Sequence, residues 1–191
     1  MILIREASRA DADACAAAHI EGWRVGYRNL LPADFLDAPQ FASQRLDRWR
    51  AWTWADGLHM AGLFVAEVHG RVVGFGLCGA ERAQPACDQI DGGDGAAAPT
   101  GRGEVYAFYL HPEAWGSGAA APLMARCQQH LRTAGFAEAV LWVLRDNPRA
   151  RAFYERAGWA CTGRESQFEG PRAADKLARP LPEIEYRTDL L

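Results

Sequence analysis

Several features that mark other classes of protein are missing from this sequence. The five cysteines include no Cys-x-x-Cys pair and the five histidines no His-x-x-x-His pair, so no metal-ligand spacing is present. The net charge is only −3, which gives no general attraction to nucleic acid or to an anionic membrane. Residues 1–5, Met-Ile-Leu-Ile-Arg, reach a charge too soon for a signal peptide or a membrane span. We therefore expect a cytoplasmic protein with reduced cysteines, no metal, no nucleic-acid partner and no membrane attachment.

The hydrophobic patterning predicts a single domain covering residues 1–191. Alternating and helical spacings give the element order β-αα-ββ-β-α-β-α-β-β. Predicted helices begin at Ser8 (with Asp11 completing a capping-box pattern), at residue 40, after Gly118 and at Asn147. The predicted strands cover residues 2–5, 63–68, 72–77, 104–110, 139–144, 159–168 and 183–190. This order predicts a mixed α/β or α+β sheet rather than a purely parallel one.

Turn residues divide these elements. The tripeptide His69-Gly70-Arg71 predicts a hairpin turn between the second and third strands. Residues 84–103 are rich in glycine, alanine and aspartate, and they predict a flexible loop inside the domain rather than a boundary between domains.

The segment 115–121 joins the predicted strand 104–110 to the next helix. It reads Trp115-Gly116-Ser117-Gly118-Ala119-Ala120-Ala121. Small residues let a ligand approach the backbone, and the amides at a helix N-terminus favour an anion such as a pyrophosphate. The segment is not a dinucleotide fingerprint, which would need glycine at Ala121, and it is not a P-loop. By itself it indicates either an anion site or a purely structural turn.

A second motif follows the next predicted strand. It reads Asn147-Pro-Arg-Ala-Arg-Ala-Phe-Tyr-Glu-Arg-Ala-Gly-Trp159, in which Asn147 and Pro148 are typical of a helix N-cap and first helical residue. Together the two segments resemble the GCN5-related N-acetyltransferase (GNAT) superfamily. Its pyrophosphate pattern, Arg/Gln-x-x-Gly-x-Gly/Ala, is matched by Trp115, Gly118 and Ala120. Its second pattern, Asn-x-x-Ala-x-x-Phe-Tyr-x-x-x-Gly-Phe, is matched by Asn147, Ala150, Phe153, Tyr154, Gly158 and Trp159. The resemblance covers nearly the whole chain.

The resemblance implies a mixed, mostly antiparallel sheet of about seven strands, flanked by helices and splayed in the middle to hold CoA. Acetyl-CoA is then the co-substrate, with its pantetheine arm paired to strand amides and its pyrophosphate on the glycine turn. Asn147 either contacts the pantetheine arm as well as capping its helix or caps the helix alone, and Arg149 either reaches a phosphate or solvates the helix, as is expected of Arg151. The implied cofactor-binding residues are Phe108, Tyr109, Leu110, Trp115, Gly116, Ser117, Gly118, Ala119, Ala120, Ala121, Asn147, Arg149 and Phe153.

The implied chemistry is attack of an amine on a thioester, which needs a base for the amine and an acid for the leaving thiolate. Tyr154 matches the family's usual general acid, and its alternative role is packing on a helix face. Glu104 matches the glutamate that serves as base in the histone-modifying branch, and its alternative is a solvated strand start. His111 is a second candidate base, with a structural role beside Pro112 as the alternative.

Two residues depart from the family pattern. Trp115 stands where arginine or glutamine is common, so phosphate binding is expected to rest on the amides of residues 117–121. Pro122 donates no amide, and we expect it to loosen the first helical turn and to weaken CoA binding modestly.

The sequence specifies the acyl acceptor less closely than the cofactor. His19, Trp23 and Tyr27 are the candidate substrate residues, joined by Trp49 and Trp52, and an aromatic core is the alternative for all of them. The leading expectation is acetyl transfer to a primary amine of a small molecule. The alternatives are a protein N-terminus or lysine as acceptor, and an acyl-CoA-binding sensor without turnover. Homodimers are frequent in the family, so a second copy of this chain is an expected partner.

Overall fold

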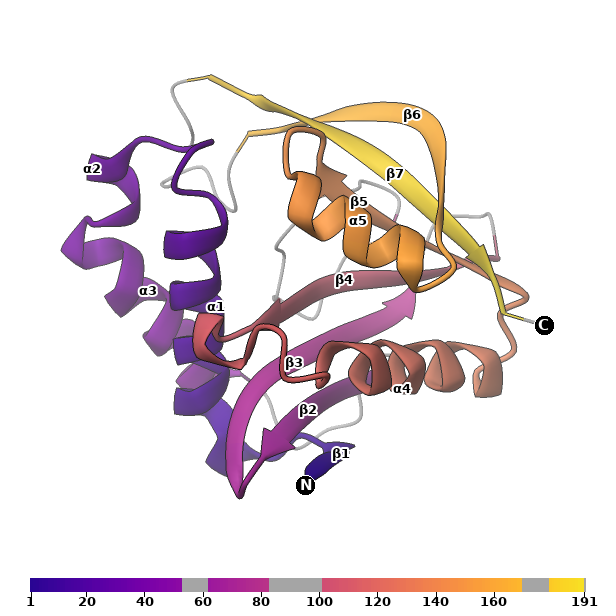
Figure 1. Ribbon diagram of the computed structural model, residues 1–191, viewed down its shortest axis with the longest axis horizontal. Coiled ribbons are helices and arrows are strands. Elements are labelled where there is room, and N and C mark those ends of the chain that lie inside the picture. The colour runs from indigo at the N-terminus through magenta and orange to yellow at the C-terminus, as the bar shows by residue number, and fades with distance from the viewer. Residues whose placement is uncertain (53–61, 83–100, 170–178, 191) are drawn as a thin grey trace. The chain divides into compact units, whose positions relative to one another are not determined.

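The computed structural model describes residues 1–52, 62–82, 101–169 and 179–190 (Figure 1). The predicted flexible loop at 84–103 therefore lies mostly outside the described residues. The chain divides into two compact units. The first unit comprises Met1–Gly76 and Phe108–Arg126, and the second comprises Leu77–Ala107 and Cys127–Leu191. None of the helices in the described ranges is long and apolar enough to cross a membrane.

Seven strands form one sheet in the order β1-β2-β3-β4-β5-β7-β6. Among the pairs whose register is defined, β1–β2, β5–β7 and β6–β7 are antiparallel and β4–β5 is parallel, which confirms the predicted mixed, mostly antiparallel sheet. The strands are β1 Ile2–Glu6, β2 Gly62–Val68, β3 Arg71–Ala80, β4 Gly103–Leu110, β5 Glu138–Leu144, β6 Ala160–Phe168 and β7 Leu181–Asp189.

The parallel pair β4–β5 has a short register. It joins Gly103 to Ala139, Glu104 to Val140 and Val105 to Leu141. In the described part of the second unit the register stops at Val105 and Leu141, although β5 continues to Leu144 and pairs with β7 along its whole length.

The helices agree with the predictions in position and differ in detail. They are η1 Arg9–Asp11, α1 Ala12–Gly26, α2 Ala33–Leu36, α3 Pro39–Ala51, η2 Pro112–Ala114, α4 Ala120–Thr133 and α5 Pro148–Arg156. The one-turn helix α2 was not predicted. The predicted helix at 40–55 ends at Ala51, and residues 53–55 lie outside the described ranges.

Local signals position the first helix and the first hairpin. The Asp11 carboxylate accepts hydrogen bonds from the amide and the hydroxyl of Ser8, at 2.8 and 2.9 Å, so the predicted capping interaction starts the helical region. His69 and Gly70 both have positive φ, 51° and 78°, as the tight turn of a β2–β3 hairpin requires.

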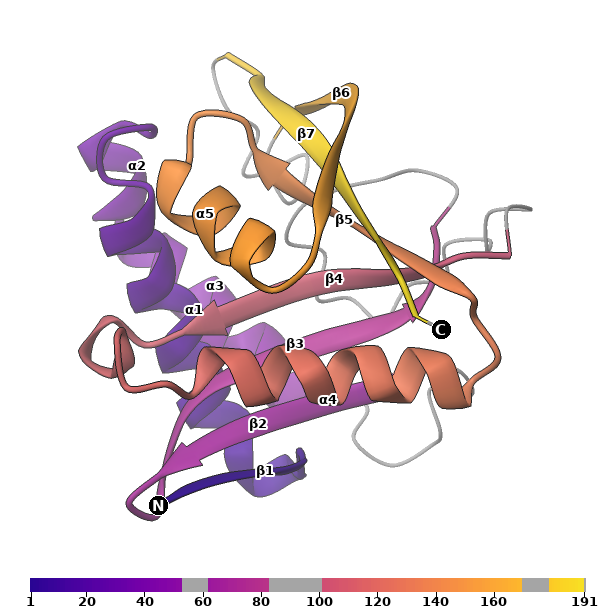
Figure 2. The ribbon, with the colours of Figure 1, turned by 45° about the vertical axis from the view of Figure 1, so that its right-hand side comes forward.

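The core of the first unit is aromatic. Helix α1 packs on α3, where the indole N–H of Trp49 donates to His19 Nδ1 at 3.3 Å. The N-terminal half of α4 lies beside β2 in Figure 2, and there the Arg126 guanidinium is 4.1 Å from the centre of the Phe64 ring. The largest fully buried side chains of this unit include Trp23, Trp49, Arg45, Phe64 and Phe75.

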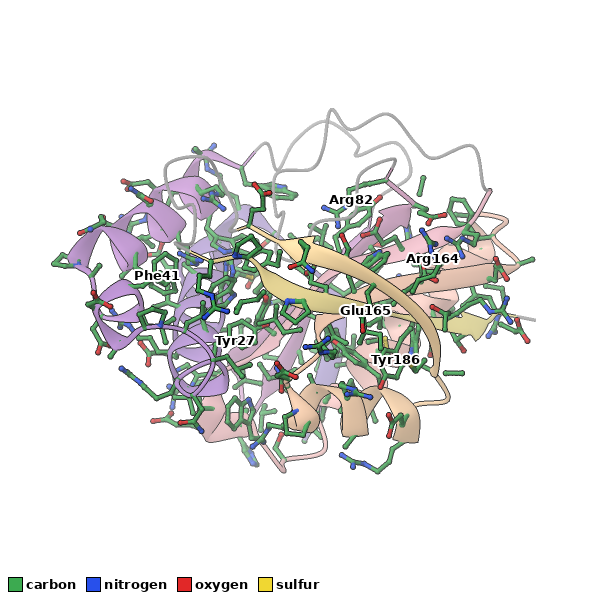
Figure 3. The ribbon with its side chains drawn as sticks, turned by 90° about the horizontal axis from the view of Figure 1, so that it is seen from above. Tyr27, Phe41, Arg82, Arg164, Glu165 and Tyr186 are labelled. Carbon is green, nitrogen blue, oxygen red and sulfur yellow. The ribbon has the colours of Figure 1, made fainter. Side chains whose placement is uncertain are left out.

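In the second unit, the core lies between the strands β5 and β7 on one side and the helices α4 and α5 on the other. Its buried side chains include Cys127, Leu131, Val140, Leu141, Phe168 and Tyr186. Strand β7 pairs with β5 on one side and β6 on the other, and β6 is mostly exposed. Helix α5 lies close to β6 and β7 (Figures 1 and 3). A hydrogen bond from Arg151 to the Tyr186 hydroxyl joins the helix to β7.

Candidate functional site

The glycine turn before α4 has the backbone shape that only glycine adopts without strain. Gly116 and Gly118 have φ values of 80° and 87°. The amide of Ser117 donates to the carbonyl of Ala114 at 3.1 Å, and the amide of Ala119 donates to Ser117 Oγ at 3.3 Å. These two amides are thus engaged inside the turn itself. Of the predicted phosphate donors at 117–121, the amides of Gly118, Ala120 and Ala121 are then the better candidates.

Pro122 is the third residue of α4, which begins at Ala120. The amide of Leu123 donates to the carbonyl of Ala119 at 3.3 Å. The first amides of any helix have no intrahelical acceptor, so a proline at this position removes no helical hydrogen bond. The expected loosening of the first turn by Pro122 is therefore wrong in its premise.

Trp115 and His111 have local structural contacts. The indole N–H of Trp115 donates to the carbonyl of Leu110 at 3.0 Å, which ties the turn to the end of β4. His111 Nδ1 accepts the amide of Glu113 at 3.4 Å and caps the short helix η2. This is the structural alternative for His111, and its role as a base gains nothing from the geometry.

Asn147 caps α5 as its sequence predicts. Its Oδ1 accepts the amide of Ala150 at 3.1 Å, and the residue is buried. Arg149 is exposed on the first turn of α5. Arg151 does more than solvate the helix, because its Nε donates to the Tyr186 hydroxyl at 3.0 Å and its Nη1 to the carbonyl of Arg145 at 3.0 Å.

Tyr154 is buried on α5 among other aromatic rings. Its ring centre lies 5.4 Å from that of Phe153, 6.5 Å from that of Trp159 and 6.1 Å from that of Tyr186. Packing and proton transfer are compatible in such a setting, since the ring can pack while the hydroxyl reacts. The acid role of Tyr154 stays a prediction.

Glu104 is buried in β4 and bound to Arg82. Its Oε2 accepts the amide of Arg82 at 2.9 Å and the Nε of Arg82 at 3.2 Å, while its Oε1 accepts Nη2 at 2.5 Å. Both carboxylate oxygens are therefore engaged by one guanidinium, and the exposed, solvated alternative for Glu104 is excluded. No local sequence pattern points to Arg82, which lies 22 positions before Glu104.

The candidate substrate residues lie inside the first unit. His19 and Trp23 are fully buried and Tyr27 nearly so, which agrees with the core alternative. The polar atoms of Trp23 and Tyr27 meet at Tyr109 of β4: the indole N–H of Trp23 donates to the Tyr109 hydroxyl at 3.0 Å, and the Tyr27 hydroxyl is 3.5 Å from it. The ring of His19 is 4.8 Å from that of Tyr109, and Trp52 stacks on Trp49 at 5.8 Å.

The site residues divide between the two units. The first unit holds the strand end with Phe108, Tyr109 and Leu110, the turn 115–121 and the aromatic cluster around Trp23. The second unit holds Glu104, Asn147, Arg149, Phe153 and Tyr154. No group of His, Cys, Asp and Glu side chains able to hold a metal ion occurs in the ranges that the structure describes.

Comparison with known families tests the resemblance that the two sequence motifs indicate. The model of the acetyltransferase (GNAT) family matches residues 24–159, which include the turn 115–121 and the motif at 147–159. The chain belongs to the acetyltransferase (GNAT) family. As a GNAT protein it falls in the predicted enzyme class, the acyl-CoA-dependent N-acyltransferases.

Two curated relatives support the GNAT assignment. The chain is 30% identical over 149 residues to YuaI of Bacillus subtilis, an uncharacterized N-acetyltransferase, with 78% of this chain and 75% of YuaI covered. It is 31% identical over 138 residues to a mycothiol acetyltransferase of Parafrankia, with 72% of this chain covered. The match spans only 43% of that longer relative.

Solved structures confirm the GNAT fold. PaiA N-acetyltransferase from Thermoplasma acidophilum, in complex with coenzyme A, aligns with a TM-score of 0.64 at 14% identity over 99% of both chains. The yncA structure from Salmonella typhimurium, with its cofactor acetyl-CoA, aligns with a TM-score of 0.61 at 22% identity. That alignment covers 100% of this chain and 94% of yncA.

Proposed function

We propose that this GNAT protein transfers the acetyl group of acetyl-CoA to a primary amine of a small molecule. The observation that carries the proposal is the glycine turn at 115–121, which leads directly into the N-terminus of the 14-residue helix α4. Two relatives of the same fold are described with coenzyme A and with acetyl-CoA, which supports acetyl-CoA as the donor.

The pyrophosphate would lie on the turn. The amides of Gly118, Ala120 and Ala121 are the proposed donors, since those of Ser117 and Ala119 already have acceptors inside the turn. The positive end of the helix dipole adds to their attraction for phosphate. Trp115 would contribute through its bond to the Leu110 carbonyl, which holds the turn in place, rather than through a charge.

The pantetheine arm would pair with the backbone of β4 at Phe108, Tyr109 and Leu110. The support for this role is the resemblance to the GNAT pattern, in which the amide chain of pantetheine pairs with this strand as an added β-strand would. Asn147 and Phe153 of α5 are the proposed side-chain contacts of the same arm, and Arg149 is the proposed phosphate contact from this helix.

Tyr154 is the proposed general acid for the thiolate of CoA. A phenol has an ordinary pKa near 10, close enough to that of a thiol for proton sharing. Glu104 is retained as the proposed base for the amine, but only if its carboxylate leaves Arg82 during turnover. A base that acts through water is the alternative that the Arg82 contact favours.

The support for a small-molecule acceptor is that one relative is named a mycothiol acetyltransferase, and the amine follows from the N-acetyltransferase class. The aromatic cluster of His19, Trp23 and Tyr27 would then act indirectly, by holding the Tyr109 ring and hydroxyl in place. Homodimer formation belongs to the proposal only through the resemblance to the family.

Two measurements test the proposal. Titration calorimetry with acetyl-CoA should show saturable binding, and its absence at millimolar donor would overturn the choice of donor. Release of free CoA thiol should then be followed with a panel of small primary amines, a peptide with a free N-terminus and a peptide with a free lysine. Turnover with a small amine supports the proposal. Turnover with a peptide alone identifies a protein acetyltransferase, and binding without any turnover identifies a sensor.

A further inference from the structure

Tyr186 of β7 is fully buried and its hydroxyl joins two side chains of α5 (Figure 3). The hydroxyl donates to Glu155 Oε1 at 2.7 Å and accepts from Arg151 Nε at 3.0 Å. Burial raises the pKa of Tyr186, so the phenol keeps its proton at neutral pH and is the donor toward Glu155. The neutral Tyr186 hydroxyl of β7 thus binds two oppositely charged side chains of α5, Glu155 and Arg151.

The contact fixes the rotation of the helix about its own axis. Arg151 and Glu155 are four positions apart, so they lie on one face of α5 about one turn from each other. A single atom of β7 therefore holds two successive turns of a nine-residue helix. Arg151 also donates to the carbonyl of Arg145, just before the helix cap Asn147, so the start of the helix is tied down as well.

We propose that Tyr186 is a positioning residue for Tyr154: by holding Arg151 and Glu155 it sets the direction in which α5 presents the Tyr154 phenol. This inference rests on the proposed acid role of Tyr154. Tyr154 precedes Glu155 directly, and its ring lies 6.1 Å from that of Tyr186, so a change in the helix rotation moves the phenol at once. Proton transfer tolerates little misplacement of the donor, whereas the binding of a long cofactor through many amides tolerates more.

The first test is Tyr186→Phe, which keeps the ring and removes both hydrogen bonds. We expect kcat to fall about tenfold, with the KM for acetyl-CoA unchanged. The same substitution made in a Tyr154→Phe background should cause no further loss, because the residue acts through Tyr154. An unchanged kcat, or an equal loss in both backgrounds, would overturn the proposal. If wild-type protein turns over and Tyr154→Phe keeps the full rate, the acid role itself is wrong.

A second pair of variants covers the case in which Tyr186→Phe folds poorly. Glu155→Gln keeps an oxygen that accepts from Tyr186 and should keep kcat, whereas Glu155→Leu removes this acceptor and should lower kcat by part of the loss seen in Tyr186→Phe, since Arg151 still donates to the hydroxyl. Thr188→Val is the matched control, because Thr188 lies on the same strand and donates to the carbonyl of Gly158, beyond the end of α5. Thr188→Val should leave kcat unchanged. Equal rates for the two Glu155 variants would contradict the proposal.

Discussion

At the scale of single residues, the buried contact between Arg82 and Glu104 has a large energetic consequence. Both side chains are buried, with exposed fractions of 7% and 1%. Removing one member of a buried ion pair costs about 3–5 kcal/mol, because the other charge is left without a partner in a medium of low polarity. A loss of activity on mutation of Glu104 is therefore ambiguous until the free energy of unfolding is known.

A double variant separates the two roles of Glu104. Glu104→Gln should lower the free energy of unfolding by about 3 kcal/mol in urea titrations. Adding Arg82→Met should recover most of this loss, since the unpaired charge is removed. If Glu104 is the base, kcat stays low in both the single and the double variant. Recovery of kcat together with stability contradicts the base role.

Asp11 gives the stability of the protein a dependence on acid. The hydrogen bonds from Arg5 hold the pKa of the Asp11 carboxyl at about 2, below its ordinary value. The contribution is present above the ordinary pKa near 4, and it is lost as the pH falls through about 2. Asp11→Asn should cost about 1.5 kcal/mol at pH 7, because partial exposure of Arg5 screens the interaction, and the difference should shrink below pH 4.

The control for Asp11 is Asp13→Asn, which removes an exposed pair with Arg50. Exposed pairs contribute little, so its stability should follow that of the wild type at every pH. Urea titrations at pH 7, 4 and 3 measure both variants. A difference for Asp11→Asn that persists undiminished at pH 3 would contradict the assignment.

Which residue contacts could be anticipated depends on their distance along the chain. The cap of Asn147 on Ala150 and the contact between Ser8 and Asp11 join residues three apart, so a short pattern predicts them. Arg82 with Glu104 and Arg151 with Tyr186 join residues 22 and 35 positions apart. Such pairs arise from strand register and helix packing, and no local spacing encodes them.

At the scale of elements, the two ends of α4 provide a matched comparison. Gly118 precedes the helix and Gly135 follows it, with φ values of 87° and 93°, and an added Cβ would cause no clash at either position. Alanine should therefore cost each position a similar free energy of unfolding, about 1 kcal/mol. Only Gly118→Ala should also weaken acetyl-CoA binding, by about tenfold or 1.4 kcal/mol.

Thermal unfolding and titration calorimetry on the two variants make the comparison. Equal affinity of Gly118→Ala and Gly135→Ala for acetyl-CoA would contradict the proposal that the CoA pyrophosphate binds on the turn. Pro122→Ala extends the test, since its position in the first turn predicts an affinity close to that of the wild type.

The helices with strong hydrophobic spacing agree with the predictions, and the short helices α2 and η2 were not predicted. The sequence of α2, Ala33–Leu36, lies between Pro32 and Pro39, and proline inside a helix removes a backbone donor, so the local pattern favours a break there. In the structure Pro32 is the N-cap residue of α2 and Pro39 the first residue of α3. Proline at a helix start needs no amide acceptor, so both prolines begin helices here instead of excluding them.

At the scale of the whole molecule, the two compact units share elements. Strands β3 and β4 and helix α4 each contribute residues to both units. We keep the prediction of a single domain and expect one cooperative thermal transition with equal calorimetric and van't Hoff enthalpies. Two resolved transitions would contradict it. Light scattering on the same samples tests the homodimer.

Among the cysteines in the described ranges, Cys161 is the one exposed to solvent and open to chemical labelling. Cys15, Cys78 and Cys127 are buried, and burial raises the pKa of the Cys15 thiol, while Cys161 is exposed on β6. The backbone register places Cys161 opposite Tyr186. A maleimide fluorophore on Cys161 would therefore lie on β6, next to the strand β7 that binds α5 through Tyr186. Its emission would then report movement of α5. The same sulfur adds a background signal to any thiol-reagent assay of CoA release, which Cys161→Ser removes.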